Sequence, residues 1–143
     1  MKVLIRRLDP DLQLPTYARA GDAGMDLFAA EDVKLEPGQR TAIPTGIALA
    51  IPEGYAGFVQ ARSGRSLQEG LGVANAPGLI DSGYRGEVKV IAVNLDGSGL
   101  IDIRRGEKIA QIVFQKVERA EMELVDDLPD SDRGAGGFGS TGR

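Results

Sequence analysis

Apolar and polar side chains alternate along short stretches of this chain, and turns rich in glycine and proline separate the stretches. Between positions 41 and 51, the apolar residues Ile43, Ile47, Leu49 and Ile51 share one parity, as expected for a strand with one buried face. Similar patterns predict further strands at 2–8, 32–35, 55–61, 87–95, 100–103 and 108–117. Residues 96–99 are typical of a hairpin connection between two of these strands.

Helical periodicity is scarce. One or two helical turns are expected at 63–69, since Gly70 and Gly72 then end the pattern. Many short strands joined by glycine and proline turns predict an all-β fold, either a sandwich, a barrel or a jelly roll.

The end of the chain has a different composition. Six of the twelve residues at 121–132 are acidic, and 133–143 is rich in glycine. Such a segment cannot bury enough apolar surface to hold itself in place, so we predict a β domain at 1–129 and a flexible arm at 130–143. A frayed terminus is the simpler interpretation. However, the arm carries groups suited to a phosphate and a flat ring, namely Arg133, Phe138, Ser140 and Thr141.

Composition restricts the chemistry. The 143 residues are 42% hydrophobic, which allows one modest core, and the net charge of −4 argues against binding to a nucleic-acid backbone. The chain has no cysteine and no histidine, which excludes disulfides, thiolate and histidine metal sites, and a histidine base. Catalysis must then use carboxylates, lysine, tyrosine or serine, and a bound metal would be a hard ion such as Mg²⁺.

Neither a secretion signal nor a membrane span is expected. Residues 1–7 are too short and too charged for a signal peptide, and the apolar stretch 43–51 is broken by Pro44 and Gly46. We therefore expect a cytoplasmic protein without a membrane partner.

One candidate phosphate site lies at 61–66, after a predicted strand and at the start of the predicted helix. The Arg62 guanidinium, the Ser63 hydroxyl and the free backbone N–H groups around Gly64 suit a phosphate chain. A solvated turn that contains two arginines is the alternative interpretation. Gln111 lies in a predicted strand, and by itself indicates only an outward-facing residue.

The segment 72–87 is a second candidate site, here for a catalytic carboxylate and for contacts to a sugar or a base. Asp81, held in a tight loop, could take a proton from water, and Tyr84 could pack on a sugar or a base. Asn75 has a donor and an acceptor and could read a base edge. Alternatively, Asp81 closes a turn and Tyr84 lies at the edge of the core. Asp22 and Asp26, in a glycine-rich context, could lie near a metal or simply form turns.

Together and in this order, these segments resemble the five motifs of the trimeric dUTP pyrophosphatase (dUTPase) family. The matching segments are 20–29, 62–66, 72–87, 105–111 and 133–142, and the most specific of them is the run 77–87. The resemblance implies a β jelly roll that forms a homotrimer with active sites shared between subunits. It also implies Mg²⁺-dependent hydrolysis of dUTP to dUMP and pyrophosphate, which keeps uracil out of DNA and supplies dUMP for thymidylate synthesis.

The resemblance also implies residue roles. Asp81 would be the general base and Tyr84 would pack against the deoxyribose, while Asn75, Ile80 and the strand around Lys89 would form the uracil pocket. Gly78 and Leu79 would also bind the substrate. The phosphates would bind Arg62, Ser63, Gly64 and Gln111, and Asp26 would hold Mg²⁺ through water. The arm would close over the nucleotide, with Phe138 on uracil and with Arg133, Ser140 and Thr141 at the γ-phosphate.

The chain departs from the family pattern at Ala135, where Asp is frequent, and at Arg65-Ser66, where a small apolar pair is commoner. Three other interpretations remain on the sequence alone. They are a dCTP deaminase-type enzyme on the same fold, a non-catalytic nucleotide-sensing module, and a β-rich assembly protein.

Overall fold

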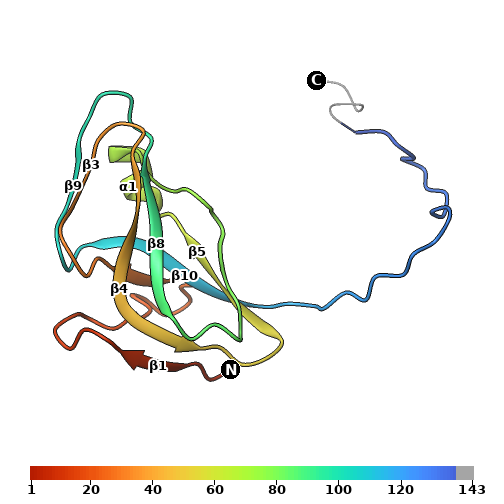
Figure 1. The fold of residues 1–143 in the computed structure, drawn as a ribbon, viewed down its shortest axis with the longest axis horizontal. Helices are drawn as coiled ribbons and strands as arrows, with labels where there is room; N and C mark the ends of the chain where they lie inside the picture. The colour runs from red at the N-terminus through yellow and green to blue at the C-terminus, as the bar shows by residue number, and fades with distance from the viewer. Residues whose placement is uncertain (138–143) are drawn as a thin grey trace.

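A computed structural model of the chain describes residues 1–137. Within that part, ten strands and one short helix follow one another along the chain (Figure 1). They are β1 (Leu4–Arg7), β2 (Met25–Phe28), β3 (Val33–Leu35), β4 (Arg40–Ala50), β5 (Tyr55–Gln60), α1 (Ser63–Glu69), β6 (Leu71–Val73), β7 (Gly78–Ile80), β8 (Glu87–Asn94), β9 (Ile101–Ile103) and β10 (Lys108–Lys116). The predicted all-β fold with one short helix is confirmed.

The strands form two four-stranded antiparallel sheets, ordered β1-β4-β8-β6 and β2-β10-β5-β7, and a separate ladder of β3 and β9. Between the two sheets lies a core of aliphatic side chains from β2, β4, β5, β8 and β10. Strand β8 alternates strictly, because Val88, Val90 and Ala92 are buried while Lys89 and Ile91 are exposed. Burial of each valine contributes about 1.5–3 kcal/mol, which fixes the face on which Lys89 emerges.

Three strands were not predicted, namely β2, β6 and β7. Each has only three or four residues, too few for alternation to be visible in the sequence. Strand β7 lies within the segment 72–87, for which a tight loop is expected, and β6 overlaps its start. The predicted helix is present, and Gly70 ends it in a left-handed conformation with φ of 70°.

Strand β4 is interrupted by a bulge between Pro44 and Ala48. At the bulge, Gly46 has a φ of 69°, and a Cβ there would lie 2.8 Å from the Asp9 side chain. The Gly46 N–H donates to the Glu87 carboxylate at 2.9 Å, which ties the start of β8 to β4. The bulge therefore supports the loop that precedes β8.

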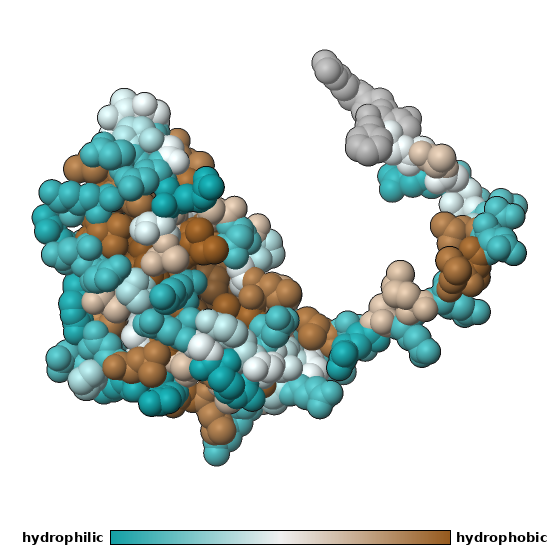
Figure 2. Space-filling view, in the orientation of Figure 1, coloured by the Kyte–Doolittle hydropathy of each residue, from teal (hydrophilic) through white to brown (hydrophobic). Residues whose placement is uncertain are grey.

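Residues 117–137 follow β10 without a helix or strand and run away from the sheets (Figure 1). Apolar residues on this segment are exposed (Figure 2), with Met122 at 89% and Leu124 at 99%. The division at 129/130 stays a prediction. In residues 1–137, no helix has the length and apolar character needed to cross a membrane.

Candidate active site

Most of the predicted site residues line two depressions. The polar depression, of about 690 Å³, is lined by Asp26, Arg62, Ser63, Gly64, Lys108 and Gln111 among others. The loop depression, of about 290 Å³, is lined by Asn75, Gly78, Leu79, Ile80, Asp81, Tyr84 and Lys89, together with Glu87, Ile91, Ala42 and Val59. No residue lines both depressions, so in a single chain they are separate.

In the polar depression, the Asp26 carboxylate on β2 binds two cations. Its Oδ1 lies 2.9 Å from Arg62 Nε, and its Oδ2 lies 2.8 Å from Lys108 Nζ. The Asp26 side chain is only 15% exposed, so solvent screens these pairs less than it screens surface pairs. This arrangement holds two positive groups at the wall of a depression, where they are available to an anion.

Gln111 is the neighbour of Asp26 across the β2–β10 ladder. Its amide nitrogen donates to the Ala61 carbonyl at 3.3 Å, directly before residues 62–64. These are the N-cap and the first two residues of α1, here called the 62–64 turn. The Gln111 amide oxygen would lie 2.8 Å from a Cβ at position 24, so a side chain at that position would displace the amide. Gln111 therefore links β10 to both neighbouring segments of the depression.

Lys108 was not predicted as a site residue. Residues three apart in a regular strand point to opposite faces, so Lys108 and Gln111 would not be expected to share a site. The register shifts between Lys108 and Ala110, however, and the two side chains line the same depression. A bulge of this kind gives no signal in the sequence.

The loop depression is built around the turn that connects β7 with β8. The Tyr84 N–H donates to the Asp81 carbonyl at 3.1 Å, and the Tyr84 hydroxyl donates to the Glu87 carbonyl at 3.0 Å. Arg85 donates to the carbonyls of Ser82 and Tyr84 at 2.6 and 2.8 Å. The turn is thus held by its own main-chain acceptors.

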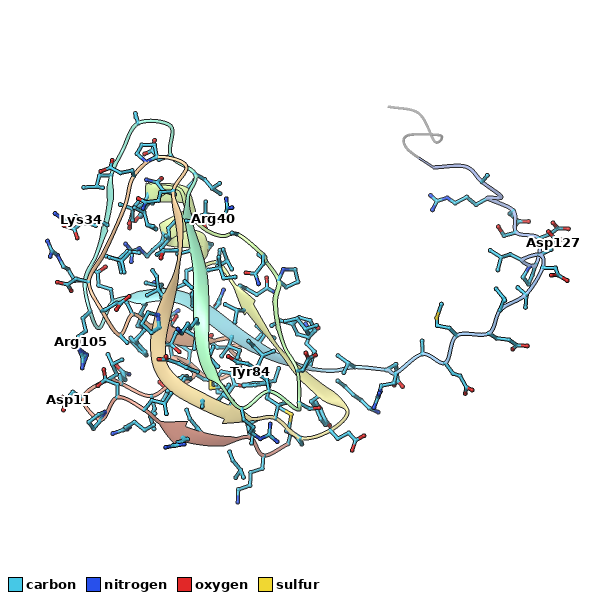
Figure 3. All side chains as sticks on the ribbon, viewed as in Figure 1. Asp11, Lys34, Arg40, Tyr84, Arg105 and Asp127 are labelled. Atoms are coloured by element: carbon cyan, nitrogen blue, oxygen red, sulfur yellow. The ribbon has the colours of Figure 1, made fainter. Side chains whose placement is uncertain are left out.

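Asp81 and Tyr84 are both exposed, and both face the loop depression. Tyr84 is 45% exposed, so it does not lie at the edge of the core; its place near the lower end of β8 is labelled in Figure 3. A Cβ at Gly86 would lie 2.6 Å from Tyr84 Cζ, so the hydroxyl end of the ring passes close to the backbone at position 86. Together with its hydrogen bond to the Glu87 carbonyl, this places the end of the ring against its own turn.

The remaining predicted residues belong to the arm. Arg133 lies on the exposed segment after β10, where its carbonyl accepts the Gly136 N–H at 3.0 Å, and it lines neither depression. Phe138, Ser140 and Thr141 lie outside the described residues. Their assigned roles therefore stay predictions.

The carboxylates of the polar depression suit a metal ion that arrives already bound to phosphates. Residues 1–137 contain no group of three or more carboxylates that could hold a metal ion alone. The polar depression nevertheless offers Asp26 and Asp22, and Mg²⁺ commonly keeps several waters and binds one or two carboxylates plus substrate phosphates. A Mg²⁺ ion chelated by phosphates fits these residues.

One carboxyl group outside the depressions has a shifted pKa. The backbone N–H of Arg105 donates to Asp32 at 2.8 Å and, with a smaller contribution from the Arg104 side chain, lowers the Asp32 pKa below its ordinary value. Asp32 thus anchors the turn that leads into β10 and Lys108.

The dUTPase family model matches residues 11–142 of this chain. The deoxyuridine 5'-triphosphate nucleotidohydrolase of Thermobifida fusca is 58% identical over 99% of this chain and 79% of the relative. The protein of the same name from Corynebacterium diphtheriae is 53% identical over 98% of this chain and 92% of the relative.

Solved structures of dUTPases are also similar to this chain. The dUTPase of Staphylococcus bacteriophage 80alpha with dUpNHpp has a TM-score of 0.91 and 31% identity, with 99% of each chain covered. A mutant dUTPase of phage phi11 of S. aureus, described with a structural Mg(II) ion, has a TM-score of 0.83 and 29% identity. The comparison covers 91% of this chain and 100% of the phage chain.

Proposed function

Because this chain belongs to the dUTPase family, we propose that it hydrolyses dUTP to dUMP and pyrophosphate with Asp81 as general base and with Mg²⁺. The chain is a dUTP diphosphatase, as its curated relatives indicate. These relatives are nucleotidohydrolases, so neither the deaminase nor the non-catalytic alternative is needed. The observation that carries the proposed mechanism is the exposed Asp81 carboxylate beside Tyr84 in the loop depression.

In the proposed reaction, a water oxygen forms a bond to the α-phosphorus while the bond from that phosphorus to the α,β-bridging oxygen breaks. The water proton passes to the Asp81 carboxylate, and pyrophosphate leaves. An ionised carboxylate is a weak base, so correct positioning of the water and neutralisation of the phosphate charge supply much of the acceleration. The polar depression provides that neutralisation.

Arg62 and Lys108 are the cations that would meet the phosphates. In the free protein both neutralise Asp26, at 2.9 and 2.8 Å. A triphosphate offers more negative charge than one carboxylate, so the two cations would turn to it, while Ser63, Gly64 and Gln111 complete the contacts. Mg²⁺ would neutralise the phosphate oxygens, with its waters held by the Asp26 carboxylate thus released.

The loop depression would select deoxyuridine. Gly78 is buried on β7, and a Cβ there would lie 3.3 Å from both the Asn75 amide and Val59. A pocket packed this closely around β7 would reject the methyl group of thymine by collision, which discriminates more strongly than a missing contact. The Tyr84 ring would lie against the deoxyribose and exclude a 2′-hydroxyl.

A second subunit would complete the site. One dUTP molecule must contact a uracil pocket and a phosphate pocket at once, yet the two depressions of one chain have no lining residue in common. A cyclic homotrimer with heterologous contacts would place the polar depression of one subunit beside the loop depression of the next. The arm, with Arg133, Phe138, Ser140 and Thr141, would then close over the nucleotide.

In the cell, this activity would keep uracil out of DNA and supply dUMP for thymidylate synthesis in the cytoplasm. The test is product analysis after incubation of the purified protein with Mg²⁺ and dUTP, dCTP, dTTP or UTP separately. We expect dUMP and pyrophosphate from dUTP alone. Release of deoxyuridine nucleotides from dCTP, or no turnover of any of the four, would overturn the proposal.

A further inference from the structure

Arg65 is the residue of α1 that contacts the segment directly before β10, the strand that carries Lys108 and Gln111. Its Nε and Nη2 donate to the Glu69 carboxylate, one helical turn later, at distances of 2.6–3.2 Å. Its Nη1 donates to Glu107 Oε2 at 3.2 Å. The Arg65 side chain is 13% exposed, so this is one partly buried guanidinium shared by two carboxylates.

Glu69 and Glu107 belong to two segments that, in the proposed function, contact the same triphosphate. Glu69 ends the helix that begins with Ser63 and Gly64, and Glu107 immediately precedes Lys108 at the start of β10. Position 107 is itself anchored, because its carbonyl accepts the Ala29 N–H at 2.9 Å. The Arg65–Glu107 contact thus joins the 62–64 turn to the strand that carries Lys108 and Gln111.

The start of α1 is held on that side by two further contacts, Arg62 with Asp26 at 2.9 Å and Gln111 with the Ala61 carbonyl at 3.3 Å. Its N-cap residue, Arg62, makes no side-chain capping hydrogen bond, and none of its seven residues is buried. A helix without a buried face is positioned by its polar contacts and by its ends. The planar fork of arginine restricts geometry more than a lysine would, since several N–H groups bind at fixed angles.

We propose that Arg65 is a positioning residue, which holds the 62–64 turn against the start of β10 so that both segments meet one triphosphate. This inference rests on the proposed function. Arg65 also neutralises Glu69 and Glu107, which would otherwise repel a triphosphate bound next to them. Both effects act on the β- and γ-phosphates and leave the uracil end unchanged.

The test compares Arg65→Met with Arg104→Met as a matched control. Arg104 also contacts two carboxylates, Asp102 at 2.7 Å and Asp32 at 3.4 Å, but neither of them belongs to α1 or to the residue that precedes Lys108. Calorimetry would measure the binding of dUpNHpp and of dUMP to each protein in the presence of Mg²⁺. We expect Arg65→Met to bind dUpNHpp about tenfold more weakly and dUMP within about twofold of wild type, since misplaced phosphate contacts are lost only by the longer ligand.

Glu107→Gln, alone and combined with Arg65→Met, tests whether the Arg65–Glu107 contact or a general loss of folding causes the weaker binding of dUpNHpp. If the contact carries the effect, the double variant should lose no more dUpNHpp affinity than Arg65→Met. Equal dUpNHpp affinities in Arg65→Met and Arg104→Met would overturn the role of Arg65, as would parallel losses for dUMP and dUpNHpp. Absence of dUTP hydrolysis by the wild-type protein would instead overturn the proposed function, so the two failures are distinguishable.

Discussion

Lys108 Nζ lies 2.8 Å from Asp26 Oδ2, across the ladder between β10 and β2. The register shift after Lys108 turns this side chain toward the polar depression, where Arg62 occupies the other Asp26 oxygen. The same carboxylate therefore orients two cations that the sequence places 46 positions apart. This pairing keeps both cations in place before a phosphate arrives.

Replacement of Lys108 by Met should weaken the binding of the triphosphate. One charge-assisted hydrogen bond to a phosphate contributes about 1.5–3 kcal/mol, so we expect KM for dUTP to rise about 10–100-fold. Steady-state kinetics would measure this, with Lys116→Met as the control at the exposed far end of the same strand. A KM unchanged from the control would mean that Lys108 only neutralises Asp26.

Asp81→Asn should abolish turnover and retain nucleotide binding. The amide cannot accept the water proton, but it has nearly the same size, and Asp81 is exposed and not needed for packing. Single-turnover hydrolysis of dUTP and calorimetric titration with dUpNHpp would measure the two properties. Asp11→Asn, in the loop after β1 (Figure 3), is the control. Loss of binding together with turnover would show that Asp81 is mainly structural.

Gly86→Ala tests the position of the Tyr84 ring. The new Cβ would lie 2.6 Å from Tyr84 Cζ, so the ring must move and its hydrogen bond to the Glu87 carbonyl breaks. We expect the ratio of kcat/KM for dUTP to that for UTP to fall, because a displaced ring leaves room for a 2′-hydroxyl.

Gly83→Ala is the matched control in the same turn, since a Cβ there has nothing within 4 Å. Both variants should melt near the wild-type temperature, because the displaced ring is exposed and the core is untouched. Unchanged discrimination in Gly86→Ala would exclude Tyr84 as the residue that recognises the sugar.

Much of this fold was predictable because the long strands alternate over enough residues. The pattern at 41–51 corresponds to β4 (Arg40–Ala50), and Gly70 ends α1 as predicted. The short strands β6 and β7 were not predictable, since three residues form no pattern. Most site residues came from a resemblance, whereas Lys108 depends on a bulge and Arg65 on a contact between distant segments, which no local pattern encodes.

Asp32→Asn should reduce stability at neutral pH and have less effect in acid. The folded-state pKa of Asp32 lies below its ordinary value of 3.8, chiefly because the Arg105 N–H donates to the carboxylate. A depressed pKa contributes stability above the unfolded-state pKa, and this contribution is lost as pH falls through the folded-state pKa. Melting temperatures at pH 7 and near pH 2 would show the difference, with Glu31→Gln as the neighbouring control. A deficit that persists unchanged in acid would mean that ionisation is not its cause.

Removal of the chain from Arg133 onward should lower kcat more than it weakens the binding of dUMP. The described part of the arm lines neither depression, so a product bound at the loop depression keeps its contacts after truncation. The proposed contacts of Arg133 with the γ-phosphate exist only with the triphosphate, and closure of the arm would exclude water during the reaction. Kinetics with dUTP and calorimetry with dUMP should be compared for the full chain and for residues 1–132. A shorter deletion of the last residue alone, Arg143, controls for truncation as such. Equal kcat values for both lengths would refute the role of the arm as a lid and leave catalysis to Asp81 and the polar depression.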